Sequence, residues 1–274
     1  MKDLPWGLWR RQIFAILRLE LRKNFLRKRA IPMYLLALAP AALFGVHAVV
    51  RLSRAQPLDA GPAAGIYAAF FQVFYLRLAI FFGSLAIFTS LFRGDILEKT
   101  LHYYFLVPVR RDVLAAGKYL AGLLTTIVLF SLGTALTFLL HYAAFGERAS
   151  QFFSSGPGLS HLAAYLGTTV LACLGYGAVF LFMGLYFSNP LIPAAIVLGW
   201  ESIHFLLPQV LKKISVLHYL LSLCPVPAPA PPLAMLAEPT PAWLSVPGLL
   251  LLTAAVLVVA AHRVRRMEIT YAAD

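Results

Sequence analysis

Apolar residues occupy this chain in six long stretches that are separated by short polar segments. A helix needs about 20 apolar residues to cross roughly 30 Å of hydrocarbon, and these stretches have about that length. Because backbone polar groups in lipid must be satisfied within the segment, each stretch is predicted to be a helix. The predicted membrane-spanning helices cover residues 31–50, 66–92, 113–145, 161–187, 191–207 and 245–261. The pattern therefore predicts an all-α, polytopic membrane protein with one transmembrane domain over 31–274, whose fifth span is the shortest.

The composition and the placement of charge support this class. Of 274 residues, 61% are hydrophobic and 12% are charged, which is far from the balance of a soluble globular domain. Six spans place seventeen Lys and Arg residues on the side of the two termini and five on the opposite side. By the positive-inside rule, both termini are cytoplasmic, which fits a multi-pass protein of the bacterial cytoplasmic (inner) membrane. The net charge of +12 is thereby assigned to topology and to anionic lipid headgroups, and a nucleic-acid partner is excluded.

Residues 1–30 are predicted to form a basic amphipathic helix, an "elbow" that lies in the membrane interface before the first span. Its apolar positions recur at steps of three and four residues and include Trp6, Trp9, Ile13, Phe14, Leu17, Leu21 and Phe25. Arginines fall largely on the rest of the helical wheel, and tryptophan suits the headgroup region. The alternative is a basic anchor that serves only to fix the topology.

A polar insert separates the second and third spans. From Asp95 to about Phe105 it is predicted to form three helical turns, with Asp95 and Lys99 spaced to pair and Pro108 ending the helix. A short rigid helix between two membrane helices can transmit a push from a soluble partner. The alternative, an ordinary solvated loop, is disfavoured by the apolar stripe and the aromatic residues around Tyr104.

The insert reads Phe-Arg-Gly-Asp-x-x-Glu-x-Thr-Leu, then Pro-Val-Arg-Arg and Gly-Lys-Tyr, and it resembles the intracellular loop of ABC-2-type transporter permeases. The resemblance implies a coupling helix at about 94–107 and a return into the third span that is marked by residues up to Lys118. The coupling residues that it implies are Arg93, Asp95, Glu98, Thr100, Leu101, Pro108, Arg110 and Arg111.

The same resemblance implies a partnership of several chains. Two permease copies, or two homologous permeases, would sit above two separate ABC ATPase subunits that bind ATP and Mg. This chain contains no Gly-x-x-x-x-Gly-Lys-Ser/Thr loop to hold a nucleotide, so it is expected to bind no cofactor and to catalyse no reaction itself. Export of a hydrophobic or amphipathic compound is the expected direction.

Three ionisable residues lie far from the ends of the predicted spans, where such groups are costly and so suggest function. Arg77 lies in the second span, and Glu201 and His204 lie three residues apart in the fifth. Counting about 1.5 Å per residue from the inner ends places them at similar depth. We expect Arg77 and Glu201 to form a buried pair that fixes the second and fifth spans together, or that opens and closes during transport. The alternative is a static pair, or an Arg77 that snorkels while Glu201 lies in a polar crevice. An ion-coupled carrier that uses these three residues is an alternative function.

The outer segment 208–244 is predicted to contain a short amphipathic helix at 209–222 and then a stiff, extended proline run that caps the transport path. Residues 146–160 are predicted to form a plain outer turn. Histidines near the outer ends of the spans leave a second alternative, a haem-carrying redox subunit; they are His47, His141, His161 and His218.

Overall fold

The structure, a computed structural model, describes residues 6–26, 30–54, 63–106, 109–203, 206–227 and 241–267. Every regular element in these ranges is helical. Five helices are long and apolar enough to cross a membrane. The all-α, polytopic membrane architecture predicted from the hydrophobic pattern is therefore confirmed.

The five long helices correspond to the first, second, third, fourth and sixth predicted spans. They are α2 (Ile31–Arg54), the continuous helix α3–η2–α4 (Ala63–Phe70, Phe71–Ala79 and Ile80–Leu97), α6 (Arg111–Ala143), α8 (Gly158–Tyr186) and α12 (Ala242–Arg265). The helices α3–η2–α4 and α12 extend beyond their predicted spans at both ends, whereas α6 and α8 begin before theirs and end one or two residues earlier. With 33 residues, α6 is about 50 Å long, which exceeds the hydrocarbon thickness.

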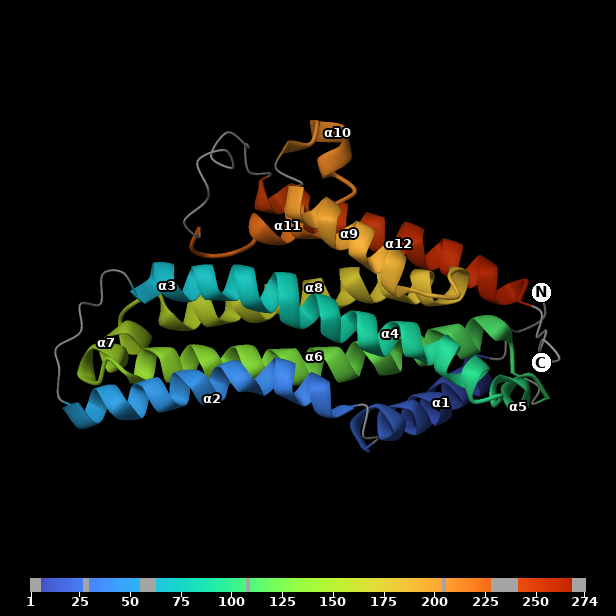
Figure 1. Ribbon diagram of the computed structural model, residues 1–274, viewed down its shortest axis with the longest axis horizontal. Coiled ribbons are helices and arrows are strands. Elements are labelled where there is room, and N and C mark those ends of the chain that lie inside the picture. Colours follow the sequence, from blue (N-terminus) through green and yellow to red (C-terminus); the bar gives the residue numbers. More distant parts are fainter. Residues whose placement is uncertain are drawn as a thin grey trace.

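The helices form an elongated bundle with α6 and α8 at its centre. α6 packs against α1 (Trp6–Leu26), α2 and α8, while α8 also packs against α4 and α12 (Figure 1). α5 (Leu101–Leu106), the first part of α1 and the end of α12 lie at one end of the bundle, and α7 (Glu147–Ser154) lies at the other. We refer to these as the α5 end and the α7 end.

The fifth predicted span is shorter than expected. α9 (Leu191–Ile203) has 13 residues, or about 20 Å, which is less than the hydrocarbon thickness. The expected helix at 209–222 is likewise divided, into α10 (Gln209–Lys212) and α11 (Val216–Leu221). Residues 228–240, which include most of the proline run, lie outside the described part of the chain.

The region around 146–160 is not the plain turn that its composition suggested. It contains α7, which begins directly after Gly146. Gly146 has φ +58°, a left-handed conformation that glycine adopts without strain, and this allows the sharp change of direction after α6.

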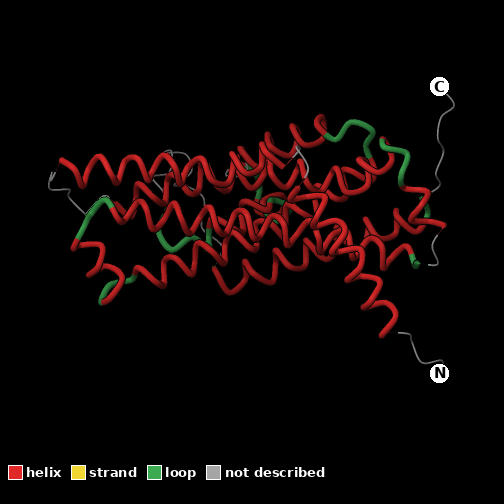
Figure 2. Tube along the Cα trace, turned by 90° about the horizontal axis from the view of Figure 1, so that it is seen from below, coloured by secondary structure: helices red, strands yellow, loops and turns green. Residues whose placement is uncertain are grey.

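α1 confirms that the N-terminal segment is helical and shows which face is covered. Ile16 packs against Gly117, and the Asn24 amide donates to Thr125 Oγ1 over 3.3 Å. From the first contact to the second, the residue number increases by eight in both helices. The second half of α1 therefore runs beside α6 in the same direction. The first half leaves the bundle at an angle (Figure 2).

Candidate functional site

A buried ion cluster lies at the α5 end, where α1, α4, α5 and α6 meet. Lys118 of α6 is fully buried, and its ammonium group donates to Glu20 Oε1 over 2.6 Å, to Asp95 Oδ2 over 2.5 Å and to the Leu91 carbonyl over 2.8 Å. Lys23 lies 3.2 Å from Asp95 Oδ1. We call Glu20, Lys23, Asp95, Lys118 and Tyr104 the ion cluster. Two carboxylates balance two ammonium groups, so the cluster is neutral as a whole.

Tyr104 connects α5 to this cluster. Its hydroxyl donates to Glu20 Oε1 over 3.0 Å and accepts from Lys23 Nζ over 3.2 Å. Burial raises the pKa of Tyr104 to about 12, with a further contribution from the negative charge of Glu20. Burial lowers the pKa of Lys23, but Glu20 and Asp95 more than offset this and keep it above its ordinary value. At neutral pH, therefore, Tyr104 remains a donor and Lys23 remains charged.

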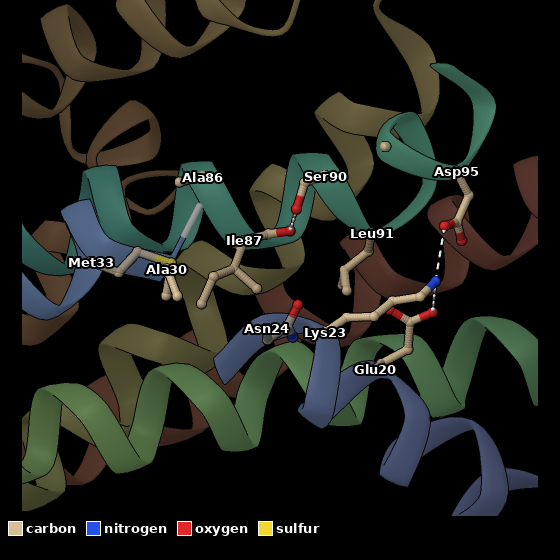
Figure 3. Close-up of a pocket in the computed structure, with 11 residues that line it drawn as sticks. Glu20, Lys23, Asn24, Ala30, Met33, Ala86, Ile87, Ser90, Leu91 and Asp95 are labelled. Atoms are coloured by element: carbon tan, nitrogen blue, oxygen red, sulfur yellow. Dashed lines mark hydrogen bonds and ion pairs between the residues drawn. The ribbon is translucent and has the colours of Figure 1, made fainter. Parts of the chain in front are cut away.

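A cavity of about 210 Å³ lies beside the cluster, between α1, α2 and α4 (Figure 3). Glu20, Lys23 and Asp95 line its polar end, and Met33 and Ile87 belong to its apolar wall. Figure 3 shows Lys23 extending from α1 toward Asp95, so the charged end of the cavity is closed by side chains of two different helices. The cavity therefore leaves one side of the cluster open, while Lys118 on the other side is fully buried.

The α1–α6 contact that brings Glu20 to Lys118 depends on Gly117. A Cβ atom at position 117 would lie 2.9 Å from Ile16 Cγ2, closer than real Cβ contacts allow. Glycine at this position therefore lets the two helices approach closely. One turn further along α1, Glu20 then reaches the ammonium group of Lys118.

The structure places Asp95 inside the protein, where the half-buried Thr100 contacts it. Asp95 is buried, and its carboxylate bonds Lys118 and Lys23 instead of forming the local contact with Lys99 that we expected. Thr100 donates to Asp95 Oδ1 over 3.3 Å. The expected continuous helix is also wrong, because α4 ends at Leu97 and Lys99 adopts φ +55° before α5 begins. The end of α4 and the separate helix α5 thus replace one straight helix, and Asp95 lies near their junction.

Arg110 and Arg111 contact other parts of this chain. The Arg110 guanidinium lies 4.8 Å from the ring centre of Trp9, a cation–π contact. Arg111 donates to the carbonyls of Arg265 and Met267 over 2.7 and 2.8 Å, which satisfies groups at the C-terminal end of α12. These residues hold α1, α6 and α12 together at the α5 end. Pro108 lies outside the described residues.

The exposed part of the insert is a mixed apolar and charged tip, which we define by the exposed side chains within residues 97–106: Leu97, Glu98, Lys99, Tyr103 and Leu106. Leu97, Tyr103 and Leu106 are 68%, 63% and 77% exposed. Glu98 is exposed and Arg93, just before the tip, is half-buried, while the structure describes Leu101 only as the first residue of α5. The tip thus presents apolar side chains to the outside while the ion cluster holds its base.

A family comparison bears on this arrangement. The model of the ABC-2 family transporter proteins matches residues 16–200, which run from Ile16 in α1 through the insert to Trp200 in α9. The chain belongs to the ABC-2 transporter family. No curated protein matches it at a significant level.

The sequence analysis of this ABC-2 transporter protein identified Lys118 only through the resemblance and did not identify Glu20, Lys23 or Tyr104. One feature of the sequence could have identified Glu20. Glu20 is the one acidic residue between Trp6 and Leu26, and it lies four residues from the buried Ile16. An acid on the inward face of a basic helix requires a basic partner from another segment.

In this ABC-2 protein, Arg77 and Glu201 lie close enough to interact electrostatically. However, the Glu201 carboxylate accepts hydrogen bonds from the start of α11: Ser215 Oγ donates over 2.5 Å, and the Val216 and Leu217 N–H groups donate over 2.9 and 3.0 Å. Arg77 lies in the π-helical segment η2, and its Nε is buried without a hydrogen-bond partner among the described residues. Glu201 therefore fastens α11 to α9, and pairing with Arg77 stays a prediction. His204 lies outside the described residues.

Replacing Glu201 by alanine should loosen α11 and the adjacent α10. Three hydrogen bonds to a carboxylate are lost and two N–H groups of α11 lose their acceptor, at a cost of about 3 kcal/mol. Trypsin should then cut at Lys212 or Lys213 on the order of 100 times faster than in the wild type, because about 3 kcal/mol raises the open population by that factor. Glu201→Gln, which keeps one acceptor oxygen, should change the rate less. Equal cleavage rates in all three proteins would show that Glu201 does not anchor this region.

Of the histidines considered for a haem site, His141 has well-defined structural contacts. His141 donates from Nε2 to the Ala63 carbonyl over 3.0 Å and packs 5.3 Å from the ring centre of Phe44. Within the described residues, no group of three or more His, Cys, Asp or Glu side chains is placed to hold a metal ion. His141 thus joins the start of α3 to α6.

Proposed function

We propose that this chain is the permease subunit of an ATP-driven transporter and that separate ATPase subunits bind its tip. ATP and Mg would bind to those partners. The transporter would work with two permease copies in the bacterial inner membrane, with both termini and the α5 end in the cytoplasm. Its substrate would be a hydrophobic or amphipathic compound that is exported.

The observation that carries this proposal is the combination of an exposed tip with a rigidly held base. Leu97, Tyr103 and Leu106 provide apolar contact area of the kind that protein interfaces bury. Below them, Asp95 and Tyr104 are bonded to α1 and α6 through the ion cluster. A force on the tip therefore acts on α1, α4 and α6 together, because none of these helices can shift without breaking a buried ionic contact.

Coupling then follows from the helix connections. α4 belongs to the continuous helix that begins at Ala63, and α6 runs to Ala143, so both extend from the ion cluster to the α7 end. Closure of the ATPases would tilt these two long helices and α1 together. Access to the path at the interface of the two permease copies would change as a result.

A charge placed on the tip tests the proposal. Leu106→Glu should reduce ATP hydrolysis and partner retention of the purified assembly by roughly 30-fold, the effect of losing an interface residue worth about 2 kcal/mol. Val210→Glu is a matched control, because Val210 is also apolar and 74% exposed but lies on α10. Equal activity of Leu106→Glu and the wild type would contradict the proposed docking surface.

A further inference from the structure

The face of α1 that points away from the bundle carries two open grooves. One is lined by residues that include Arg10, Arg11 and Phe14, and the other by residues that include Arg22 and Leu26. Arg18 lines both grooves, so they are continuous along the helix. This face lies opposite the residues that pack on α6, such as Ile16 and Glu20.

Charge on α1 is segregated between these two faces. The arginines of the grooves are exposed, whereas Glu20, the one acid of the helix, is turned inward and bound to Lys118. The outward face therefore carries four positive charges and no acidic side chain of its own helix; they are Arg10, Arg11, Arg18 and Arg22. A surface of this kind attracts a ligand with negative charge.

Apolar side chains lie between these arginines. Phe14, Leu19 and Leu26 are exposed and belong to the same two grooves. A free anion such as phosphate would leave them in water. An anionic phospholipid would cover them with its acyl chains while its phosphate meets the guanidinium groups, which suit bidentate phosphate contacts.

We propose that the outward face of α1 is a binding site for one or more anionic phospholipids. The phosphate lies between Arg18 and Arg22, which are one helical turn apart, and the acyl chains follow Leu19 and Leu26. The lipid thereby holds α1 from outside while the ion cluster holds it from inside. This site concerns the chain alone and does not depend on an ATPase partner.

Binding to the purified chain in detergent micelles tests this site. Phosphatidylglycerol and phosphatidylcholine are added separately, and the lipid-bound fraction is measured by native mass spectrometry. The wild type should bind phosphatidylglycerol more tightly. Arg18→Gln with Arg22→Gln should weaken that binding roughly 30-fold, the loss expected for two arginines at an anionic lipid surface. Added salt should weaken wild-type binding, because the contacts are electrostatic.

A control variant removes two charges elsewhere, at the half-buried Lys212 and the exposed Lys213. Lys212→Gln with Lys213→Gln changes α10 and should leave phosphatidylglycerol binding unchanged. Equal binding of the two lipids by the wild type would overturn the proposal, as would full binding by the double arginine variant. Competition by millimolar inorganic phosphate would also overturn it, because a site for a soluble anion would then explain the arginines.

Discussion

Lys118→Met is expected to destabilise the protein by about 3 to 5 kcal/mol, the usual cost of removing one partner from a buried ion pair. Lys118 is fully buried and is bonded to both Glu20 and Asp95. Without its ammonium group, the two carboxylates remain close together with Lys23 alone to balance them. Unfolding in detergent, followed by intrinsic fluorescence during a titration with sodium dodecyl sulfate, measures the loss.

Two further variants separate charge from packing. Lys23→Met should cost about 1 kcal/mol or less, because this side chain is one-quarter exposed and solvent screens its charge. Adding Glu20→Gln to Lys118→Met should recover part of the lost stability, since it removes one of the two opposed carboxylates. If Lys118→Met were as stable as the wild type, the ion cluster would not be the element that holds α1, α4 and α6 together.

Gly133→Val is expected to separate α2 from α6. A Cβ atom at position 133 would lie 2.1 Å from the Ala37 carbonyl oxygen and 3.1 Å from Tyr75 Oη. Backbone cannot move aside as a flexible side chain does, so the two helices must shift apart. That shift would also break the bond from Tyr75 Oη to the Ala37 oxygen, which is 3.1 Å long. We expect a loss of at least about 3 kcal/mol, at the upper end of the range for overpacked cores.

Gly167→Ala is the control for this substitution. Gly167 lies in α8, and a Cβ atom there would meet nothing within 4 Å. Alanine should therefore be tolerated, with a small gain from its better helix propensity. Comparing the thermal unfolding midpoints of the two variants in the same detergent measures the difference. A midpoint for Gly133→Val equal to that of Gly167→Ala would show that α2 and α6 are not in close contact.

The fold was predictable where hydrophobicity alone determines it. The long apolar runs locate α2, α6, α8 and α12 to within a few residues, because lipid leaves helices as the stable choice. The fifth span was less secure, since its apolar run is short and contains Glu201. The structure ends α9 at Ile203, and Glu201 uses its carboxylate to start α11 instead of facing lipid.

The predicted pairing of Asp95 with Lys99 was wrong for an identifiable reason. A carboxylate and a lysine four residues apart pair only if the helix continues between them. Lys99 adopts a left-handed conformation, so the helix ends and Asp95 turns toward Lys118 and Lys23 instead. Residue spacing within a segment does not reveal such a partner.

Contacts between distant segments explain what else sequence reasoning missed. Glu20 and Lys118 are 98 positions apart, and nothing in either segment alone identifies the other as its partner. The two charges nevertheless stand out, since each lies on the buried side of its helix. The insert was located correctly by its polarity and its motif, but its residues divide into an exposed tip and a buried base that spacing alone does not separate.

The central claim is that another chain that hydrolyses ATP binds the tip at residues 97–106. The most direct measurement is photo-cross-linking in cells from a benzophenone amino acid at Tyr103, which is 63% exposed, with the same label at Val210 as the control. The account predicts one adduct from position 103 whose second chain contains a Gly-x-x-x-x-Gly-Lys-Ser/Thr loop, and no such adduct from position 210. Labelling of position 103 by lipid alone, or by a chain without a nucleotide-binding loop, would contradict it.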